Sequence, residues 1–393
     1  MTIPDDHLAD YLGDVRLAVH EAARGVTERF DRKYWLECAR AGRFPDEMWQ
    51  AMVEQGLLGL GVPEEYGGSG RGVTEAVAAM EAISRAGTPL ALFILTVFAR
   101  ETVIRHGSPE QIRALVSPTV TGAQRMCFAV TEPSAGTNTF GIDTFATKTV
   151  DGHYLLNGQK IFISAIDASD TVMVITRTTR LADVADKRQG LSVFVVDVRS
   201  AGIEMHPIDI GIVMPDRQYS VFFTDVHVPA DRLIGDEGEG FRYLFDALNS
   251  ERLLAAAWAL GVGDYALAKA VEYARDRAPF GKPIGSYQGV QHPLSLAKVK
   301  LDAARLMMYT AARAFDSGVN AGYLANAAKL LASTAAVEAC DAAIQTHGGY
   351  AFDNDVDVHT LWGIARLLKI APVNNEVILN YIGEHVLRLP RSS

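Results

Sequence analysis

The stretch GHYLLNGQKIFIS (residues 152–164) decides the fold of the middle of this chain. It is rich in aromatic and β-branched side chains, which favour strands. Asp151-Gly152 and Asn157-Gly158 lie on either side of HYLL, and both pairs are strong signals for tight turns. The stretch therefore predicts a series of antiparallel hairpins. Within QKIFIS, the two-residue alternation of a strand places Phe162 and Ser164 on the same face, where both can contact one ligand.

Runs of the same kind extend from Met126 to about Val228 and include RMCFAV, TVMVITRT, LSVFVVDV and YSVFFTDVHV. On both sides the pattern is helical, because apolar residues recur at spacings of three and four from Leu8 to about Thr119 and again after GDEGEG (235–240). We therefore predict an α+β multidomain fold. It comprises an N-terminal all-α domain (1–122), a middle antiparallel β domain (123–234) and a C-terminal four-helix bundle (235–393).

The composition excludes several classes of protein. The 393 residues are 49% hydrophobic and carry a net charge of −10. Nucleic acids and anionic membranes bind basic patches, so neither is expected as the main partner. No apolar run approaches the roughly 20 residues needed to span a bilayer, so no membrane span is expected. The first residues are acidic where a targeting peptide would be basic, which predicts a cytoplasmic location.

Few metal or nucleotide signals are present. The three cysteines, Cys38, Cys127 and Cys340, are widely spaced without a CxxC pair, so we expect core residues rather than disulfides or zinc ligands. The histidines are scattered, and no metal site is expected. The chain lacks a GxGxxG after a strand and lacks GxxxxGK[ST], HExxH and GxSxG, so the usual nucleotide-binding, metalloprotease and hydrolase signals are missing.

The stretch NSERLLAAA (249–257) raises a different question, because Glu251 and Arg252 head a run that stays uncharged until Asp264. The neighbours of Glu251 on a helix, at spacings of three and four, are all apolar: Ala247, Leu248, Leu254 and Ala255. A carboxylate on an apolar face is costly unless it is paired. Either a charge from another segment forms a structural ion pair with Glu251, or the carboxylate is catalytic.

Four motifs occur in a set order: FAVTEPSAGTN (128–138), GHYLLNGQKIFIS (152–164), RAPFGKPIGSYQGVQ (277–291) and QTHGGYAF (345–352). With them, nearly the whole chain resembles the acyl-CoA dehydrogenase family of flavoproteins. The resemblance implies bound FAD and the α,β-dehydrogenation of an acyl-CoA thioester to the trans-2-enoyl-CoA. It also implies electron-transfer flavoprotein as the electron acceptor and a homotetramer as the assembly.

The resemblance also assigns roles to residues. Phe128, Val130 and Thr131 would line the flavin, with Phe162 on its edge and Ser164 near its N5 atom, while Thr137 would face the pantetheine of the substrate. A second set would hold the adenosine diphosphate part of FAD across a subunit interface: Arg277, Phe280, Gln288, Gln345 and Gly349. An arginine suits a diphosphate because its planar fork makes bidentate, permanently charged contacts.

The general base of many relatives lies in a Tyr-Glu-Gly-Thr-like segment, and here IAPVNNEVI (370–378) puts Ala371-Pro372-Val373-Asn374 on those positions. Pro372 cannot act as a base, and it lacks the backbone N–H that would help to bind the thioester carbonyl. Either the ribityl hydroxyl of the flavin would have to carry more of that task, or another amide, such as that of Val373, would have to substitute. Asn374 and Glu376 are assigned to the FAD side of this segment.

A smaller branch, which includes enzymes similar to isovaleryl-CoA and long-chain acyl-CoA dehydrogenases, supplies the base from another helix, directly before an arginine. That position is Glu251 in this chain, followed by Arg252. The resemblance therefore favours Glu251 as the base, ahead of Glu376, with Arg252 in the substrate-binding polar network. Two other functions stay open: a flavoprotein oxidase on the same fold, and a catalytically silent acyl-CoA-binding subunit of a hetero-oligomer. The acyl group, whether branched, cyclic or long, cannot be read from the sequence.

Overall fold

The computed structural model describes residues 13–391, so the predicted start of the first helix at Leu8 lies outside the described residues. The N-terminal part is helical, as predicted. Two of its helices, α5 and α6, are largely buried and form most of the contact with the rest of the molecule. The helices are α2 (Asp14–Thr27), α3 (Arg32–Ala41), α4 (Asp46–Glu54), α5 (Val73–Arg85), α6 (Ala91–His106), α7 (Pro109–Leu115) and α8 (Ser117–Val120).

The middle part is a twisted sheet in the order β6-β7-β3-β2-β4-β5-β8, with β1 also paired to β4. Neighbouring strands are antiparallel except for the pairs β1–β4 and β2–β4, which are parallel. The strands are β1 (Met126–Ala129), β2 (Phe145–Lys148), β3 (Tyr154–Ser164), β4 (Thr171–Arg177), β5 (Leu191–Asp197), β6 (Ile203–Ile208), β7 (Gln218–Val228) and β8 (Leu233–Ile234).

The two turn signals in the opening stretch have different outcomes. Asp151-Gly152 lies in the turn that joins β2 to β3, as predicted. The prediction of a turn at Asn157-Gly158 is wrong, because β3 runs on without a break and bulges there against β7. Gly158 has a φ of 144°, and a Cβ on it would lie 2.7 Å from the Cα of Thr144. The glycine therefore permits a close approach of backbones in place of a turn.

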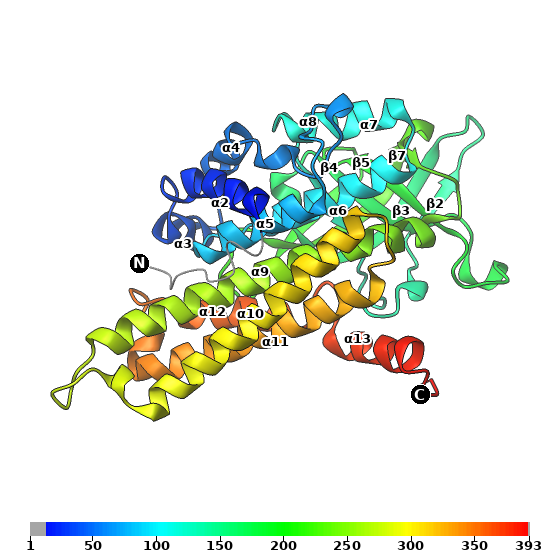
Figure 1. The fold of residues 1–393 in the computed structure, drawn as a ribbon. Helices are drawn as coiled ribbons and strands as arrows, with labels where there is room; N and C mark the ends of the chain where they lie inside the picture. Colours follow the sequence, from blue (N-terminus) through cyan, green and yellow to red (C-terminus); the bar gives the residue numbers. More distant parts are fainter. Residues whose placement is uncertain (1–12, 392–393) are drawn as a thin grey trace.

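The C-terminal part is a helical bundle in which α9, α10 and α11 lie side by side (Figure 1). The connection between α9 and α10 lies at the end of the bundle farthest from the sheet. The helices are α9 (Gly240–Asp276), α10 (Gln288–Asp316), α11 (Gly322–His347), α12 (His359–Leu367) and α13 (Asn375–Tyr381). The predicted boundaries at 122/123 and 234/235 fall in the connections α8–β1 and β8–α9.

Helix α9 packs against α5, α6, α10 and α11 at once, and every residue from 253 to 268 is buried. One 18-residue window of α9 is apolar enough to cross a membrane, contrary to the expectation that no such segment exists. However, 89% of that window is buried inside the protein, as in a core helix. Small residues permit this packing. A Cβ on Gly261 would lie 2.6 Å from the backbone nitrogen of Arg85, so only glycine lets α9 approach α5 this closely.

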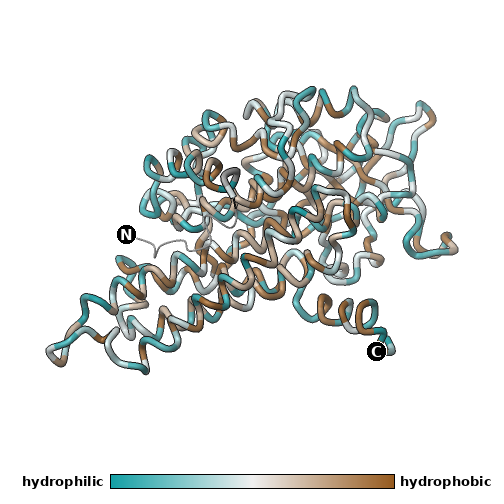
Figure 2. Tube along the Cα trace, in the orientation of Figure 1, coloured by the Kyte–Doolittle hydropathy of each residue, from teal (hydrophilic) through white to brown (hydrophobic). Residues whose placement is uncertain are grey.

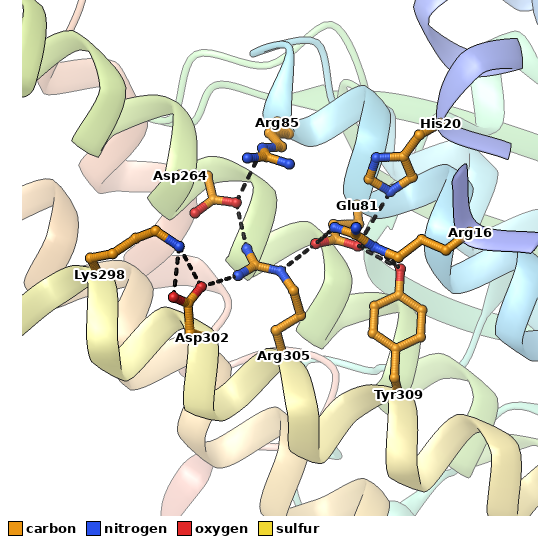
Figure 3. A network of polar contacts seen from close by, with 9 residues as sticks. All are labelled: Arg16, His20, Glu81, Arg85, Asp264, Lys298, Asp302, Arg305 and Tyr309. Carbon is orange, nitrogen blue, oxygen red and sulfur yellow. Dashed lines mark hydrogen bonds and ion pairs between the residues drawn. The ribbon is translucent and has the colours of Figure 1, made fainter. Parts of the chain in front are cut away.

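A buried polar network joins the N-terminal helices to the bundle (Figure 3). Its centre is Glu81 of α5, which is 0% exposed and accepts hydrogen bonds from Arg16, Arg305 and Tyr309. Arg305 also pairs with Asp264 and Asp302. Burial alone would raise the pKa of Glu81, but the positive charges of Arg305 and Arg16, with His20 beside them, hold it well below its usual value. The carboxylate is thus the common partner of residues from α2 and α10.

We expect the substitution Glu81→Gln to destabilise the protein by about 3 kcal/mol or more, because it leaves buried arginines without their carboxylate. The measurement is the free energy of unfolding by urea titration. Glu21→Gln is the control, since the Glu21–Arg24 pair is exposed and is expected to contribute less than about 1 kcal/mol. Equal losses of stability in the two variants would show that the buried network does not join the domains.

Candidate functional site

Glu251 lies on α9, is 5% exposed, and receives no hydrogen bond from any residue between 13 and 391. No cation from another described segment forms an ion pair with it, so the structural ion-pair interpretation is wrong. Burial raises the pKa of Glu251 to about 8, and the adjacent Arg252 opposes this rise only in part. Such a carboxyl group exchanges its proton near neutral pH, which is the property of a general base.

Arg252, the next residue, is also largely removed from solvent. Its Nη1 atom donates to Oδ1 of Asn249 at 3.0 Å, and burial lowers the pKa of the guanidinium. Its Nε–H is buried and has no hydrogen-bond partner among residues 13–391. An unsatisfied buried donor costs about 1–3 kcal/mol. Arg252 therefore has donor capacity that a polar ligand can use.

The segment that carries Pro372 joins the bundle to the middle domain. Nδ2 of Asn374 donates to Oγ1 of Thr137 at 3.1 Å, across 237 residues of sequence. Nζ of Lys329, on α11, donates to the carbonyl oxygen of Val373 at 2.5 Å. The structure therefore brings together the predicted substrate residue and the predicted Tyr-Glu-Gly-Thr-like segment. Glu376, in the first turn of α13, is exposed.

The predicted flavin residues of the middle domain also meet. The backbone N–H of Ile161, next to Phe162, donates to the carbonyl oxygen of Thr131 at 2.9 Å. Phe162 is 55% exposed, although it is aromatic, and its φ of 56° is unusual for a residue other than glycine. Ser164 is half-buried and accepts a hydrogen bond from Nε2 of Gln218 at 2.7 Å. Strained backbone and exposed aromatic side chains concentrate at ligand sites, so these residues fit a flat ring system.

An ion pair connects two of the segments that carry the predicted flavin residues, the loop after β1 and strand β3. Nζ of Lys160 donates to Oε1 of Glu132 and to the carbonyl oxygen of Val130, each at 2.9 Å. Burial lowers the pKa of Lys160 to about 8, and Glu132 opposes this. Glu132 also accepts from the backbone N–H groups of Asp143 and Thr144. The pair thus fixes the TEPSAG loop against β3. Phe128 packs on Phe98, with ring centroids 4.6 Å apart.

The second predicted set lies elsewhere. At about 1.5 Å per residue, Arg277 is about 39 Å along α9 from Glu251, at the far end of the bundle. The side chains of this set are exposed, with Phe280 at 81%. A cavity of about 550 Å³ lies beside them, between α9 and α10, lined in part by Arg275, Pro283 and Gln291. Within one chain, this second set does not meet the predicted flavin residues of the middle domain. The set comprises Arg277, Phe280, Gln288, Gln345 and Gly349.

Several residues of the site were missed by the sequence analysis. The rings of Phe140, Phe241 and Phe245 form a ladder, with centroids 4.9 and 4.3 Å apart, and Nζ of Lys187 lies 4.4 Å from the first ring. Phe241, Phe245 and Arg252 recur at helical spacing in the sequence. This spacing could have indicated that the three side chains share one face of α9. No sequence signal pointed to Gln218, because only the pairing of β3 with β7 places it beside Ser164.

One cluster has side chains of the types that bind metals. Ligand atoms of Asp151, His153 and His227 lie within 4.8 Å of one another on the surface of the sheet. Nδ1 of His153 accepts a hydrogen bond from the backbone N–H of Ala230 at 3.2 Å. The neutral ring then carries its proton on Nε2 and offers no free lone pair to an ion. The absence of a resident metal stays a prediction.

The raised pKa of Glu251 predicts a dependence of stability on pH. The folded protein binds this proton more tightly than the unfolded chain, so the contribution is fully present below about pH 4.5 and is lost as the pH rises through about 8. Glu251→Gln removes this titration. At pH 9 its free energy of unfolding is expected to exceed that of the wild type, since one pKa unit corresponds to about 1.4 kcal/mol, and at pH 5 the two should converge.

The measurement is a series of urea titrations between pH 5 and pH 9. Glu272→Gln, an exposed position on the same helix, is the control and should follow the wild type at every pH. If the curves of Glu251→Gln and the wild type run parallel, Glu251 has an ordinary pKa in the folded protein.

Comparison with known proteins identifies the family of this chain. Three family descriptions match in order: "Acyl-CoA dehydrogenase, N-terminal domain" over residues 14–123, the middle domain over 127–226 and the C-terminal domain over 238–387. The chain is 37% identical over 381 residues to acyl-CoA dehydrogenase FadE12 of Mycobacterium tuberculosis, covering 96% of this chain and 97% of that protein.

Two further relatives show how broad the match is. The caffeyl-CoA reductase–Etf complex subunit CarC of Acetobacterium woodii is 31% identical, over 93% of this chain and 97% of that protein. The solved structure of butyryl-CoA dehydrogenase from Megasphaera elsdenii has a TM-score of 0.91 and 30% identity, covering 96% of this chain and 99% of that chain. The chain therefore belongs to the acyl-CoA dehydrogenase family and is an FAD-dependent oxidoreductase.

Proposed function

We propose that the protein converts an acyl-CoA thioester to the trans-2-enoyl-CoA, with Glu251 as the base that removes the α-proton. The observation that carries this proposal is the buried carboxyl group of Glu251, which has no ion-pair partner among residues 13–391 and has a pKa raised to about 8. FAD, when bound, accepts the hydrogen of the β-carbon as hydride. The residues that would hold its ring are Phe128, Val130, Thr131, Phe162 and Ser164.

The surroundings of Glu251 suit proton removal. Near pH 8 about half of the carboxyl groups are ionised, so the base is available at a pH where cells work. The apolar neighbours favour the neutral form, and accepting a proton therefore relieves the cost of a buried charge. Arg252 lies beside the carboxyl group, and its Nε–H, which has no partner in the described part of the chain, can bind a polar part of the substrate.

The aromatic ladder supports a path for the CoA part of the substrate. Phe241 and Phe245 lie on the same face of α9 as Arg252 and precede it by two to three turns. Phe140 continues the ladder into the middle domain, where Lys187 adds a positive charge. An apolar face that ends in a cation suits a pantetheine arm that ends in phosphate groups. Thr137 would contact the pantetheine, beside Asn374.

The exposed set at the far end of α9 supports a homotetramer. Arg277 and its companions would hold the adenosine diphosphate part of the FAD of a neighbouring subunit, because their own flavin residues lie too far away. Large apolar side chains are exposed on several bundle elements, among them Leu296, Val299, Phe352 and Leu379. Figure 2 shows hydrophobic residues along α13, which projects from the bundle. Exposed apolar surface of this kind marks interfaces between proteins.

The electron acceptor is proposed to be electron-transfer flavoprotein. The name of the relative CarC places that protein in a complex with Etf. Anaerobic reduction of the protein by an acyl-CoA, followed by exposure to air, distinguishes this acceptor from oxygen. Slow reoxidation in air that electron-transfer flavoprotein accelerates supports the dehydrogenase, and rapid reoxidation with formation of peroxide supports an oxidase.

Glu251→Gln tests the base, because it keeps the shape of the side chain and removes its ability to accept a proton. Flavin reduction by acyl-CoA should fall at least about 10²-fold, whereas FAD content and oligomeric state stay unchanged. In the wild type the rate should rise with pH through about 8, as the carboxyl group ionises. Stopped-flow bleaching of the flavin measures both effects. Glu272→Gln should react at the wild-type rate, and a wild-type rate in Glu251→Gln would place the base elsewhere.

A carboxylate introduced at residue 372 tests whether IAPVNNEVI (370–378) corresponds to the Tyr-Glu-Gly-Thr-like segment of many relatives. Pro372→Glu in the Glu251→Gln background puts a carboxylate at the position that the larger branch uses. We expect it to restore part of the flavin reduction, since residue 251 on α9 and residue 372 in the connection between α12 and α13 can face the same α-carbon from different segments. The same bleaching assay measures the rescue. If Pro372→Glu restores nothing while FAD stays bound, residue 372 does not face the substrate.

Arg277→Ala tests the second FAD group. We expect less FAD in the purified protein and a lower melting temperature, because a cofactor that binds only the native state stabilises it. Flavin absorbance and thermal unfolding are the measurements. Arg275→Ala, also exposed at the same end of α9, is the control and should retain FAD. Equal FAD content and melting temperature in Arg277→Ala and the wild type would mean that Arg277 is only a surface charge.

A further inference from the structure

Lys329 is an unusual buried residue of α11. It is 1% exposed, and it forms no ion pair with any carboxylate among residues 13–391. Its Nζ atom donates instead to the carbonyl oxygen of Val373 at 2.5 Å and to Oδ1 of Asn375 at 2.9 Å. Burial lowers the pKa of Lys329 to about 7, Glu376 opposes this, and Arg252 and Lys369 lower it further. A buried ammonium group is costly, so its use on a backbone carbonyl calls for a functional reason.

The Lys329 contact fixes the direction of a neighbouring N–H group. The peptide bond between Val373 and Asn374 is trans. In a planar trans peptide, the carbonyl of one residue and the N–H of the next point in opposite directions. Since the carbonyl of Val373 points to Lys329 on α11, the N–H of Asn374 points away from α11.

That N–H group is available to a ligand. The backbone N–H groups of Val373 and Asn374 donate to no residue between 13 and 391, whereas the N–H of Asn375 donates to the carbonyl oxygen of Lys369 at 3.0 Å. The side chain of Asn374 bonds to Thr137, the predicted substrate residue of the middle domain. Lys329 also lies close enough to Arg252 for the two charges to interact, so this segment is near the base.

We propose that Lys329 is a positioning residue that orients the peptide between Val373 and Asn374, so that the N–H of Asn374 donates to the thioester carbonyl of the acyl-CoA. This inference rests on the proposed function. It assigns to Asn374 the donor role that Pro372, without an N–H, cannot fill. When Glu251 removes the α-proton, negative charge moves to the thioester oxygen, and a fixed donor stabilises it.

The direct test is the infrared stretch of the thioester carbonyl of a 2-enoyl-CoA labelled with ¹³C at that carbon, bound to the FAD-loaded protein. A hydrogen bond moves this band to lower wavenumber. We expect a large shift in the wild type and a smaller one in Lys329→Met, which keeps the side-chain length without the donor. Flavin reduction by acyl-CoA should fall on the order of 10²-fold in kcat, the effect of losing one oxyanion donor.

Ser333→Ala is the matched control on the same helix. Ser333 bonds to Asn375 but not to the carbonyl of Val373, so the variant should show the wild-type band shift. If Lys329→Met does not fold, Asn374→Pro and Asn374→Ala give an independent comparison. The φ of Asn374 is −67°, which proline can adopt. Both variants lose the Asn374 side chain, but only proline loses the N–H, so only Asn374→Pro should lose the band shift.

The outcomes separate this inference from the proposed function. A wild type that binds no 2-enoyl-CoA and is not bleached by any acyl-CoA would overturn the proposed function and, with it, the inference. A wild type that is bleached, together with equal band shifts in Lys329→Met and the wild type, would overturn only the role of Lys329. Equal band shifts in Asn374→Pro and Asn374→Ala would show that the donor is a different amide.

Discussion

The rest of the structure depends on the complete burial of α9 between residues 253 and 268. This helix contacts the N-terminal helices, the other bundle helices and the sheet, so it cannot rotate or slide without opening all three interfaces. Glycine and alanine allow the close approach, as at Gly261 against α5. A helix held from all sides fixes the residues next to its buried segment. Glu251 lies just before that segment, and Arg277 follows the last residue of the helix, so the packing of α9 positions both.

Buried carboxyl groups of the scaffold differ from the buried carboxyl group of the candidate site in whether they form ion pairs. Glu81 and Glu132 are buried carboxylates with cationic partners, and they join segments far apart in the sequence. Glu251 is equally buried, but burial raises its pKa, because the adjacent Arg252 forms no ion pair with it and opposes the rise only in part. Among residues 13–391, Glu251 is thus a buried carboxyl group without an ion pair, at the point where a proton is proposed to be removed. The fully buried helix that follows provides the stability that offsets this cost.

The segment around Pro372 illustrates how a family position can change its role. If Pro372 occupies the position that the resemblance assigns to it, proline there removes both a carboxylate and an N–H. The base is proposed to come from α9, and the amide donor from Asn374, whose peptide is oriented by a buried lysine. The proposed base and the proposed amide donor belong to different segments. Each can therefore be tested without disturbing the other. The separation of Arg277 from the flavin residues similarly divides cofactor binding between two subunits in the proposed assembly.

The sequence by itself determined the order of helical and strand regions, because hydrophobic periodicity is a local property of the chain. It also determined the family, through motifs in a fixed order, and it led to the prediction that Glu251 is the base. It could not determine that Asn157-Gly158 forms a bulge, since the pairing of β3 with β7 overrides the local turn preference. Whether Glu251 has a partner, and whether Lys329 contacts Val373, was decided only by the tertiary structure. Both depend on segments brought together by folding, and burial and hydrogen bonding between distant segments leave no pattern along the chain.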